Sequence, residues 1–174
     1  MEGFEATTNR AIASLAGVST AALYHYFPSK ADLYVAVCES IDSSFVEVIG
    51  LATRHHATLE RRLGALFAEV GKLANQSPST VSFIAGMSAV VRKHPEVVVG
   101  TERLAKDFRR MVHDLVDTAE EKDRILCGAS TQAFADMVTS VLAGLGRLNV
   151  KGDRDRHIAA GDAFLRLVRG SAAH

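Results

Sequence analysis

The chain has 174 residues, of which 48% are hydrophobic and 23% are charged, which is enough apolar material to bury one sizeable core. Its 20 Lys and Arg balance its 20 Asp and Glu, so the overall composition lacks the basic excess that usually accompanies nucleic-acid binding. Three prolines and little strand-like alternation indicate an all-α fold. With no signal peptide and no apolar run long enough to cross a membrane, we expect a cytoplasmic protein.

Two short helices joined by a tight turn are predicted within the first 30 residues. Either hydroxyl of Thr7-Thr8 can cap the first helix, and Gly17 tolerates the positive φ that a helix C-terminus often requires. Ser19 is a suitable cap for the second helix, which Pro28 ends. The inward-facing residues are predicted to be Ile12, Ala13, Leu15, Ala16, Leu23 and Phe27.

This arrangement is a helix-turn-helix, whose second helix lies in the major groove of DNA. Small residues let that helix approach the base edges, and hydroxyl and ring groups suit bases and phosphates. Lys30 opens the next helix and is a candidate for binding phosphate. The predicted DNA-binding residues are Thr8, Asn9, Ser19, Thr20, Ala21, Ala22, Tyr24, His25, Tyr26 and Lys30. The alternative is a generic helical corner with two buried aromatics. However, three adjacent aromatic residues, 24–26, cannot all face a core.

The residue order resembles the tetracycline-repressor (TetR) family of bacterial transcription regulators over about the first fifth of the chain. The matching residues are Gly3-Phe4, Thr7-Thr8, Ile12-Ala13, Ala16-Gly17-Val18-Ser19, Leu23-Tyr24, Phe27, Ser29-Lys30 and Leu33. The resemblance implies a helix-turn-helix DNA-binding domain at 1–34 and a helical ligand-binding and dimerisation domain at 35–174. Family members carry a further helix before the Gly-Phe pair, so we expect this DNA-binding domain, called the head below, to be incomplete at its N-terminus. Residues 1–34 also hold two basic residues against three acidic ones.

Apolar residues at helical spacing predict helices through the rest of the chain. The predicted segments are a helix of about twenty residues over 31–49, a break at 50–56, helices at 59–76, 78–94 and 95–118, a charged loop at 120–123, helices at 124–148 and 153–169, and a turn at 151–153. Cys38 and Cys127 fall in apolar helical runs without metal-binding spacing, so both are expected to be small buried hydrophobes in a reducing compartment.

The last two helices contain many small residues, which permit close helix packing. In the family, these two helices form a four-helix dimer interface, and the resemblance implies a homodimer through 124–148 and 153–169. The alternative is that they complete a monomeric core.

Large, adaptable side chains of the middle helices are predicted to line a pocket for an apolar or aromatic effector, although each is also an ordinary core residue. They are Phe67, Phe83, Met87, Phe108, Met111, Phe134 and Met137.

Enzyme motifs are lacking from the sequence: we find no nucleophile elbow, no Gly-rich phosphate loop, no HExxH pair and no close carboxylate pair. The adjacent His55-His56 would point in different directions on a helix and more simply face water. We therefore expect no catalytic residue, metal or cofactor. The resemblance to the family implies a repressor that binds a near-palindromic operator as a dimer and is released by a small apolar or aromatic ligand. The alternative is a helical ligand-binding or interaction protein that has lost DNA binding.

Overall fold

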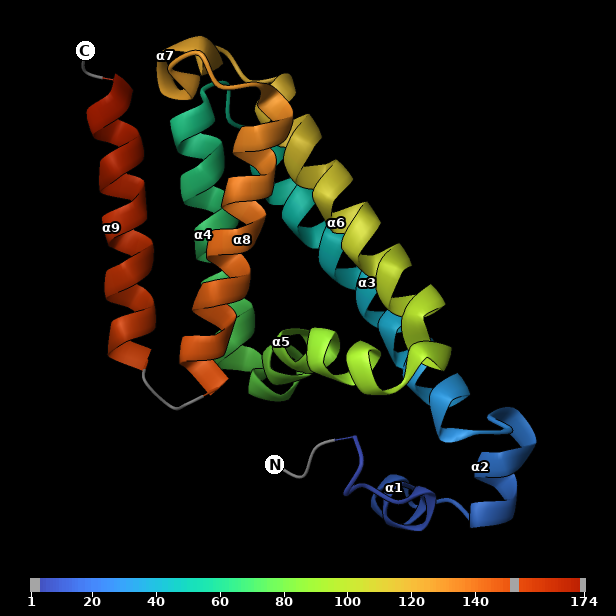
Figure 1. Cartoon of the computed structure of the whole chain (residues 1–174). Coiled ribbons are helices and arrows are strands. Elements are labelled where there is room, and N and C mark those ends of the chain that lie inside the picture. The colour runs from blue at the N-terminus through green and yellow to red at the C-terminus, as the bar shows by residue number, and fades with distance from the viewer. Residues whose placement is uncertain (1–3, 151–153, 173–174) are drawn as a thin grey trace.

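The computed structural model describes residues 4–150 and 154–172, and their regular structure is helical throughout, which confirms the predicted all-α fold. The elements are α1 Asn9–Ala16, α2 Thr20–Tyr26, α3 Lys30–Arg54, α4 Leu59–Gln76, α5 Pro78–Lys93, the 3-10 turn η1 Pro95–Val97, α6 Val98–Asp117, α7 Lys122–Leu126, α8 Thr131–Val150 and α9 Arg154–Ala172. Figure 1 shows α1 and α2 at one end of the molecule, connected to the body by the long helix α3. Within the described ranges, no helix combines the length and apolar character that a bilayer crossing requires.

The caps of the first three helices are as the sequence predicts. The Thr8 hydroxyl accepts a hydrogen bond from the Ala11 amide, and the Ser19 hydroxyl accepts one from the Ala22 amide. Gly17 has a φ of 69° and ends α1 in the left-handed conformation that favours glycine. Ser29 and Asp32 form a reciprocal capping box at the start of α3. Local side-chain chemistry therefore determines where these short helices begin and end.

The predicted helix boundaries from 59 to 118 agree with the structure, and the errors lie on either side of this region. The predicted break at 50–56 is wrong, because α3 continues through Gly50 to Arg54. The buried Thr53 hydroxyl donates a hydrogen bond to the carbonyl oxygen of Ile49, one turn earlier, so it is accommodated within the helix. The predicted helix at 124–148 is interrupted, because Cys127 adopts a left-handed conformation after α7, and α8 begins only at Thr131. The predicted turn at 151–153 lies outside the described residues.

Two hydrophobic cores hold the molecule together. The body core lies among α3, α4, α6, α7, α8 and α9 and includes Leu63, Val116 and Val138, all of them fully buried. A smaller neck core lies where α3, α5, η1 and α6 meet and consists of Tyr34, Cys38, Met87, Val97 and Leu104. Phe4, from the segment before α1, packs against the neck core. The head is therefore joined to the body by side-chain packing as well as by the continuous α3.

The two cysteines occupy opposite environments. Cys38 has no exposed surface, and its burial in the neck core raises the pKa of its thiol to about 11. Cys127 is exposed, so its predicted burial is wrong. The apolar run around it does not continue as a helix, and this break leaves Cys127 at the surface.

We expect one thiol per chain to react with Ellman's reagent in the folded protein at pH 8. The thiolate is the reactive form, and at this pH Cys38 stays a buried neutral thiol because its pKa of about 11 lies well above it. Addition of 6 M guanidinium chloride is expected to raise the count to two. Two rapidly reacting thiols in the native protein would contradict the burial of Cys38, and Cys127→Ser identifies which thiol reacts.

Candidate nucleic-acid interface and ligand pocket

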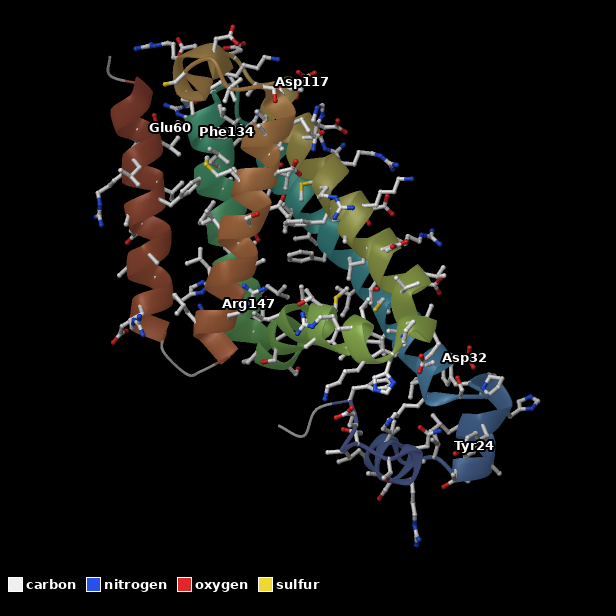
Figure 2. The ribbon with its side chains drawn as sticks, viewed as in Figure 1. Tyr24, Asp32, Glu60, Asp117, Phe134 and Arg147 are labelled. Atoms are coloured by element: carbon white, nitrogen blue, oxygen red, sulfur yellow. The ribbon has the colours of Figure 1, made fainter. Side chains whose placement is uncertain are left out.

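The second helix of the head, α2, presents a polar and aromatic surface. Leu23 is buried under it, whereas Tyr24 is 49% exposed and Tyr26 is 74% exposed. His25 is also exposed, and its ring meets the Tyr26 ring edge-on at a centroid distance of 5.2 Å. Figure 2 shows Tyr24 on α2, at the opposite end of the molecule from Phe134 in the body core. The three aromatic residues that could not all face a core are thus presented to solvent together.

Small and hydroxyl-bearing residues surround this aromatic surface. Ala21 is exposed, and Thr20 and Ala22 are half-buried at its edge. The exposed hydroxyls of Thr8 and Ser19 accept backbone hydrogen bonds as caps, and each keeps its own O–H available to donate to a phosphate oxygen. Asn9 is half-buried, and its side-chain oxygen faces the protein. Apart from Asn9, the predicted residues of α1 and α2 lie at the surface or its margin.

Lys30 makes contacts within the head. Its ammonium donates to the Phe4 carbonyl at 2.7 Å and to the Thr7 carbonyl at 3.2 Å, and it lies 4.4 Å from the centre of the Phe4 ring. These three interactions direct the charge into the head. Lys30 therefore holds the segment before α1 against the start of α3, and its contact with DNA stays a prediction.

Phe4 also joins the head to the end of α5. Its ring meets Tyr34 edge-on at 5.2 Å and lies 4.6 Å from the ring of His94. Beside it, Glu5 forms an ion pair with Lys93 at 3.1 Å, and this pair lowers the pKa of the exposed Glu5 carboxyl. The contacts with Lys93 and His94 join residues about ninety positions apart, and no local pattern in the sequence indicates them.

The seven residues predicted to line an apolar pocket are spread over the molecule. Phe83 and Met87 belong to the neck core, and Phe134 lies in the body core. Phe67 stacks on Phe164 and Phe108 stacks on Phe45, whereas Met137 is 44% exposed. Met111 does line a pocket. The ordinary core interpretation therefore holds for most of them, because residues at helical spacing pack against whichever helix is nearest.

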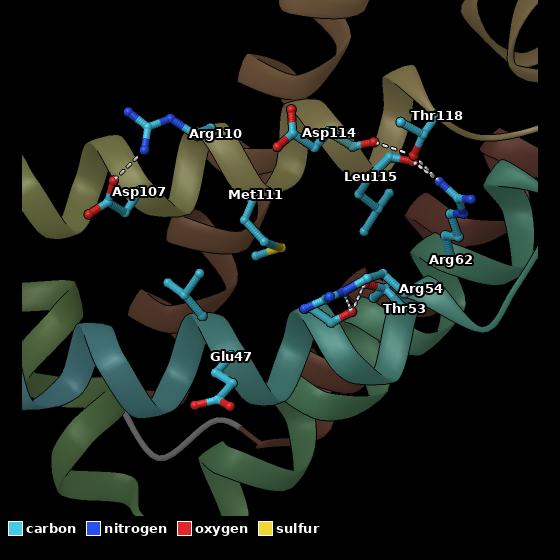
Figure 3. Close-up of a pocket in the computed structure, with 12 residues that line it drawn as sticks. Glu47, Thr53, Arg54, Arg62, Asp107, Arg110, Met111, Asp114, Leu115 and Thr118 are labelled. Atoms are coloured by element: carbon cyan, nitrogen blue, oxygen red, sulfur yellow. Dashed lines mark hydrogen bonds and ion pairs between the residues drawn. The ribbon is translucent and has the colours of Figure 1, made fainter.

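The pocket that Met111 lines has a volume of about 790 Å³ and lies between the second half of α3, the second half of α6 and the start of α4. Figure 3 shows Met111 and Leu115 facing α3 across this space. Half of its twelve lining residues are charged, three of them arginines. A smaller pocket of about 320 Å³ lies between α3, α4 and α5, and half of its ten lining residues are apolar, among them Phe45 and Leu73. The described residues contain no group of three His, Cys, Asp or Glu that could hold a metal ion.

Comparison with known proteins also identifies the head as similar to a helix-turn-helix domain of the tetR family. Residues 1–37 match the family model described as bacterial regulatory proteins, tetR family, which confirms the resemblance. Relatives include the nucleoid occlusion factor SlmA of Haemophilus ducreyi, 28% identical over 107 residues that cover 62% of this chain and 51% of the relative. SlmA of Haemophilus influenzae strain Rd is 31% identical over 84 residues, covering 48% of this chain and 38% of the relative. The chain thus spans about half, or less, of the length of these relatives.

Almost the whole chain is similar in fold to a solved structure. The crystal structure of the transcriptional regulator FadR from Bacillus subtilis in complex with stearoyl-CoA matches with a TM-score of 0.73, over 95% of this chain and 89% of that chain. The sequence identity of 16% means that this likeness shows the fold alone. The arrangement of a small head on a helical body is therefore shared with that regulator.

Proposed function

We propose that this chain, whose N-terminal head carries the tetR-family helix-turn-helix, is a cytoplasmic transcription regulator that binds operator DNA as a dimer. The observation that supports this most strongly is the exposed surface of α2, where Tyr24, His25 and Tyr26 lie together on a helix capped at both ends. Small Ala21 beside them lets the helix backbone approach base edges. Repression is the proposed mode, because a protein bound at an operator blocks access to the DNA there.

The proposed dimer forms through the outer surfaces of α8 and α9. Exposed apolar side chains occur on both helices, with Met137 at 44% and Leu167 at 72% exposure. Ala160 and Ala163 are exposed one to two turns before Leu167 on the same side of α9. Paired heads about one duplex turn apart, roughly 34–36 Å, would read the two halves of a near-palindromic operator. Two copies of each contact compensate for the few basic residues of the head.

The proposed effector site is the larger pocket between α3 and α6. It lies at the end of α3 remote from the head, so a ligand that alters the packing of α3 against α6 also alters the position of α1 and α2. Such a ligand lowers operator affinity only if it binds the two positions of the head with different affinities. The two sites are therefore coupled through one continuous helix of 25 residues.

Replacing Tyr24 with alanine is expected to weaken operator binding by about tenfold or more, since one base contact contributes about 1–3 kcal/mol and the dimer makes it twice. The operator is first selected from a pool of random duplexes, and affinities are then measured by mobility shift. Because Tyr24 is half exposed, the melting temperature should stay unchanged. Leu51→Ala is a matched control, because Leu51 is also 49% exposed but lies near the far end of α3.

A second candidate function is a helical ligand-binding protein that does not bind DNA. The charge of the head favours it, because the described residues 4–34 contain two basic residues, Arg10 and Lys30, against Glu5 and Asp32, and Lys30 is directed inward. Recovery of no preferred duplex from the selection would support this function. Recovery of a near-palindrome whose binding requires Tyr24 would exclude it.

A further inference from the structure

The larger pocket contains an arginine that lies back along α3, beside Gly50. The Arg54 side chain turns back along the helix, and its Nε donates to the Gly50 carbonyl at 3.0 Å. A β-carbon at Gly50 would lie 3.4 Å from the Arg54 Nη2. This distance is an ordinary van der Waals contact, so the guanidinium packs closely against the helix at Gly50. Figure 3 shows this guanidinium on the α3 side of the pocket, facing Met111.

A second guanidinium is held at the other end of the pocket. Arg62 Nε donates to the His56 carbonyl at 2.7 Å, and its Nη1 donates to the Leu115 carbonyl at 2.9 Å and to the Thr118 hydroxyl at 2.7 Å. These neutral acceptors fix the group in place without neutralising it. The partial negative charge at the C-terminus of α6 stabilises it there.

The acidic residues around the pocket do not form ion pairs with these two arginines. Asp107 pairs with Arg110 at 3.1 Å, and Asp114 lies 3.6 Å from His113. Figure 3 shows the Glu47 carboxylate on the side of α3 turned away from α6. In the part of the chain that the structure describes, no carboxylate lies within ion-pair distance of Arg54 or Arg62. The lining thus carries three arginines and three carboxylates, but the guanidinium groups of Arg54 and Arg62 are not paired with any of these carboxylates.

We propose that this pocket binds a small organic anion, a carboxylate with a short apolar body. The planar guanidinium fork matches a carboxylate, and Arg54 keeps its two terminal nitrogens for that purpose. Met111, Leu115 and Val46 provide apolar contacts for the remainder of the ligand. A volume of about 790 Å³ is more than enough to admit such a molecule. The ligand is thus more polar than the apolar or aromatic effector that the sequence indicated.

The role of this anion as effector rests on the proposed function, whereas the site itself does not. The carboxylate would be held by Arg54 on α3, against apolar contacts from Met111 and Leu115 on α6. Binding would thus fix the distal half of α3 relative to its neighbours, while the proximal end of α3 carries the head.

The test compares binding of hexanoate and benzoate with binding of their neutral amides, hexanamide and benzamide, to the full chain by calorimetry. At least one carboxylate is expected to bind about tenfold or more tightly than its amide, because charge-assisted hydrogen bonds are about twice as strong as neutral ones. Added salt should weaken carboxylate binding, since Arg54 is exposed to solvent. Equal affinity of each acid and its amide, or no binding of either acid, would overturn the proposal.

Two variants assign the selectivity to this pocket. Arg54→Met should abolish the preference for the acid, whereas Arg61→Met, which removes an exposed arginine of α4 outside the pocket lining, should preserve it. Retained selectivity in Arg54→Met would overturn the site. Arg54 is chosen over Arg62 because Arg62 also caps α6 and its loss would disturb folding.

Operator binding with and without the selective acid separates the two proposals. A carboxylate that binds selectively and lowers operator affinity supports both the site and its role as effector. Selective binding that leaves operator affinity unchanged supports the anion site and contradicts the effector role. Operator binding by a protein without acid selectivity contradicts the anion site alone.

Discussion

Replacing Gly100 with alanine is expected to destabilise the protein by about 1–3 kcal/mol, the usual range for overpacking a core. A β-carbon at this position of α6 would lie 2.8 Å from Val35 Cγ1 and 3.1 Å from Val35 Cα. A rotamer change can move the methyl group, but the Cα belongs to the backbone of α3, so the two helices must separate. Denaturant unfolding measures the loss of stability.

The sign of this effect makes the prediction specific. Gly71→Ala on α4 is the matched control, because a β-carbon there meets nothing within 4 Å. It should stabilise the protein by up to about 1 kcal/mol through helix propensity. Val35→Ala in the Gly100→Ala background removes the contact with Cγ1 and should restore part of the stability. A Gly100→Ala variant as stable as Gly71→Ala would contradict the close approach of α6 to α3.

Gly100 also bears on function, because Val35 lies within the first two turns of α3, next to the head. Separation of α6 from α3 at this point is expected to shift the head relative to the body and to lower operator affinity as well as stability. Gly71→Ala should leave operator affinity unchanged. The close packing of these two helices would then be part of the mechanism that positions the DNA-binding surface.

Those features of the head that depend on local chemistry were predictable from the sequence. Thr8, Gly17, Ser19 and the Ser29–Asp32 box each act on groups within a few residues, so the sequence alone determines them. The orientation of Lys30 was not predictable in this way. Its partners are carbonyl groups 23 and 26 residues earlier, and backbone carbonyls carry no residue-specific signal.

The ligand pocket illustrates the same limit at the level of tertiary structure. Large apolar residues were expected to line it, yet Phe67, Phe108 and Phe134 are core residues that stack or pack against other helices. Half of the residues that line the pocket are instead charged, and their spacing in the sequence suggests only a solvated helix surface. Gly50 is the one local signal, since a glycine inside a long helix costs stability and therefore suggests a packing or functional reason.

Replacing Leu167 with glutamate is expected to convert the proposed dimer into a monomer. Leu167 is 72% exposed on α9, beside the exposed Ala160 and Ala163, so in a single chain the new carboxylate faces water and folding should be unaffected. In a two-fold symmetric interface the substitution occurs twice, and each buried, unpaired carboxylate costs several kcal/mol. Sedimentation velocity at micromolar concentration measures the change in mass.

Ile158→Glu is the matched control for this substitution. It lies nine residues earlier on α9, so at about 100° per residue its side chain points to the opposite side of the helix from Leu167. With 49% exposure it also tolerates a charge in the single chain. The Ile158→Glu protein should remain a dimer that binds the operator, whereas Leu167→Glu should lose about a hundredfold or more in apparent operator affinity, because linked half-sites gain that much from avidity.

A dimer that survives Leu167→Glu but dissociates with Ile158→Glu would place the interface on the other side of α9. Two unaffected dimers would show that the subunits associate elsewhere, and the spacing of the heads would then have to be derived from that other surface.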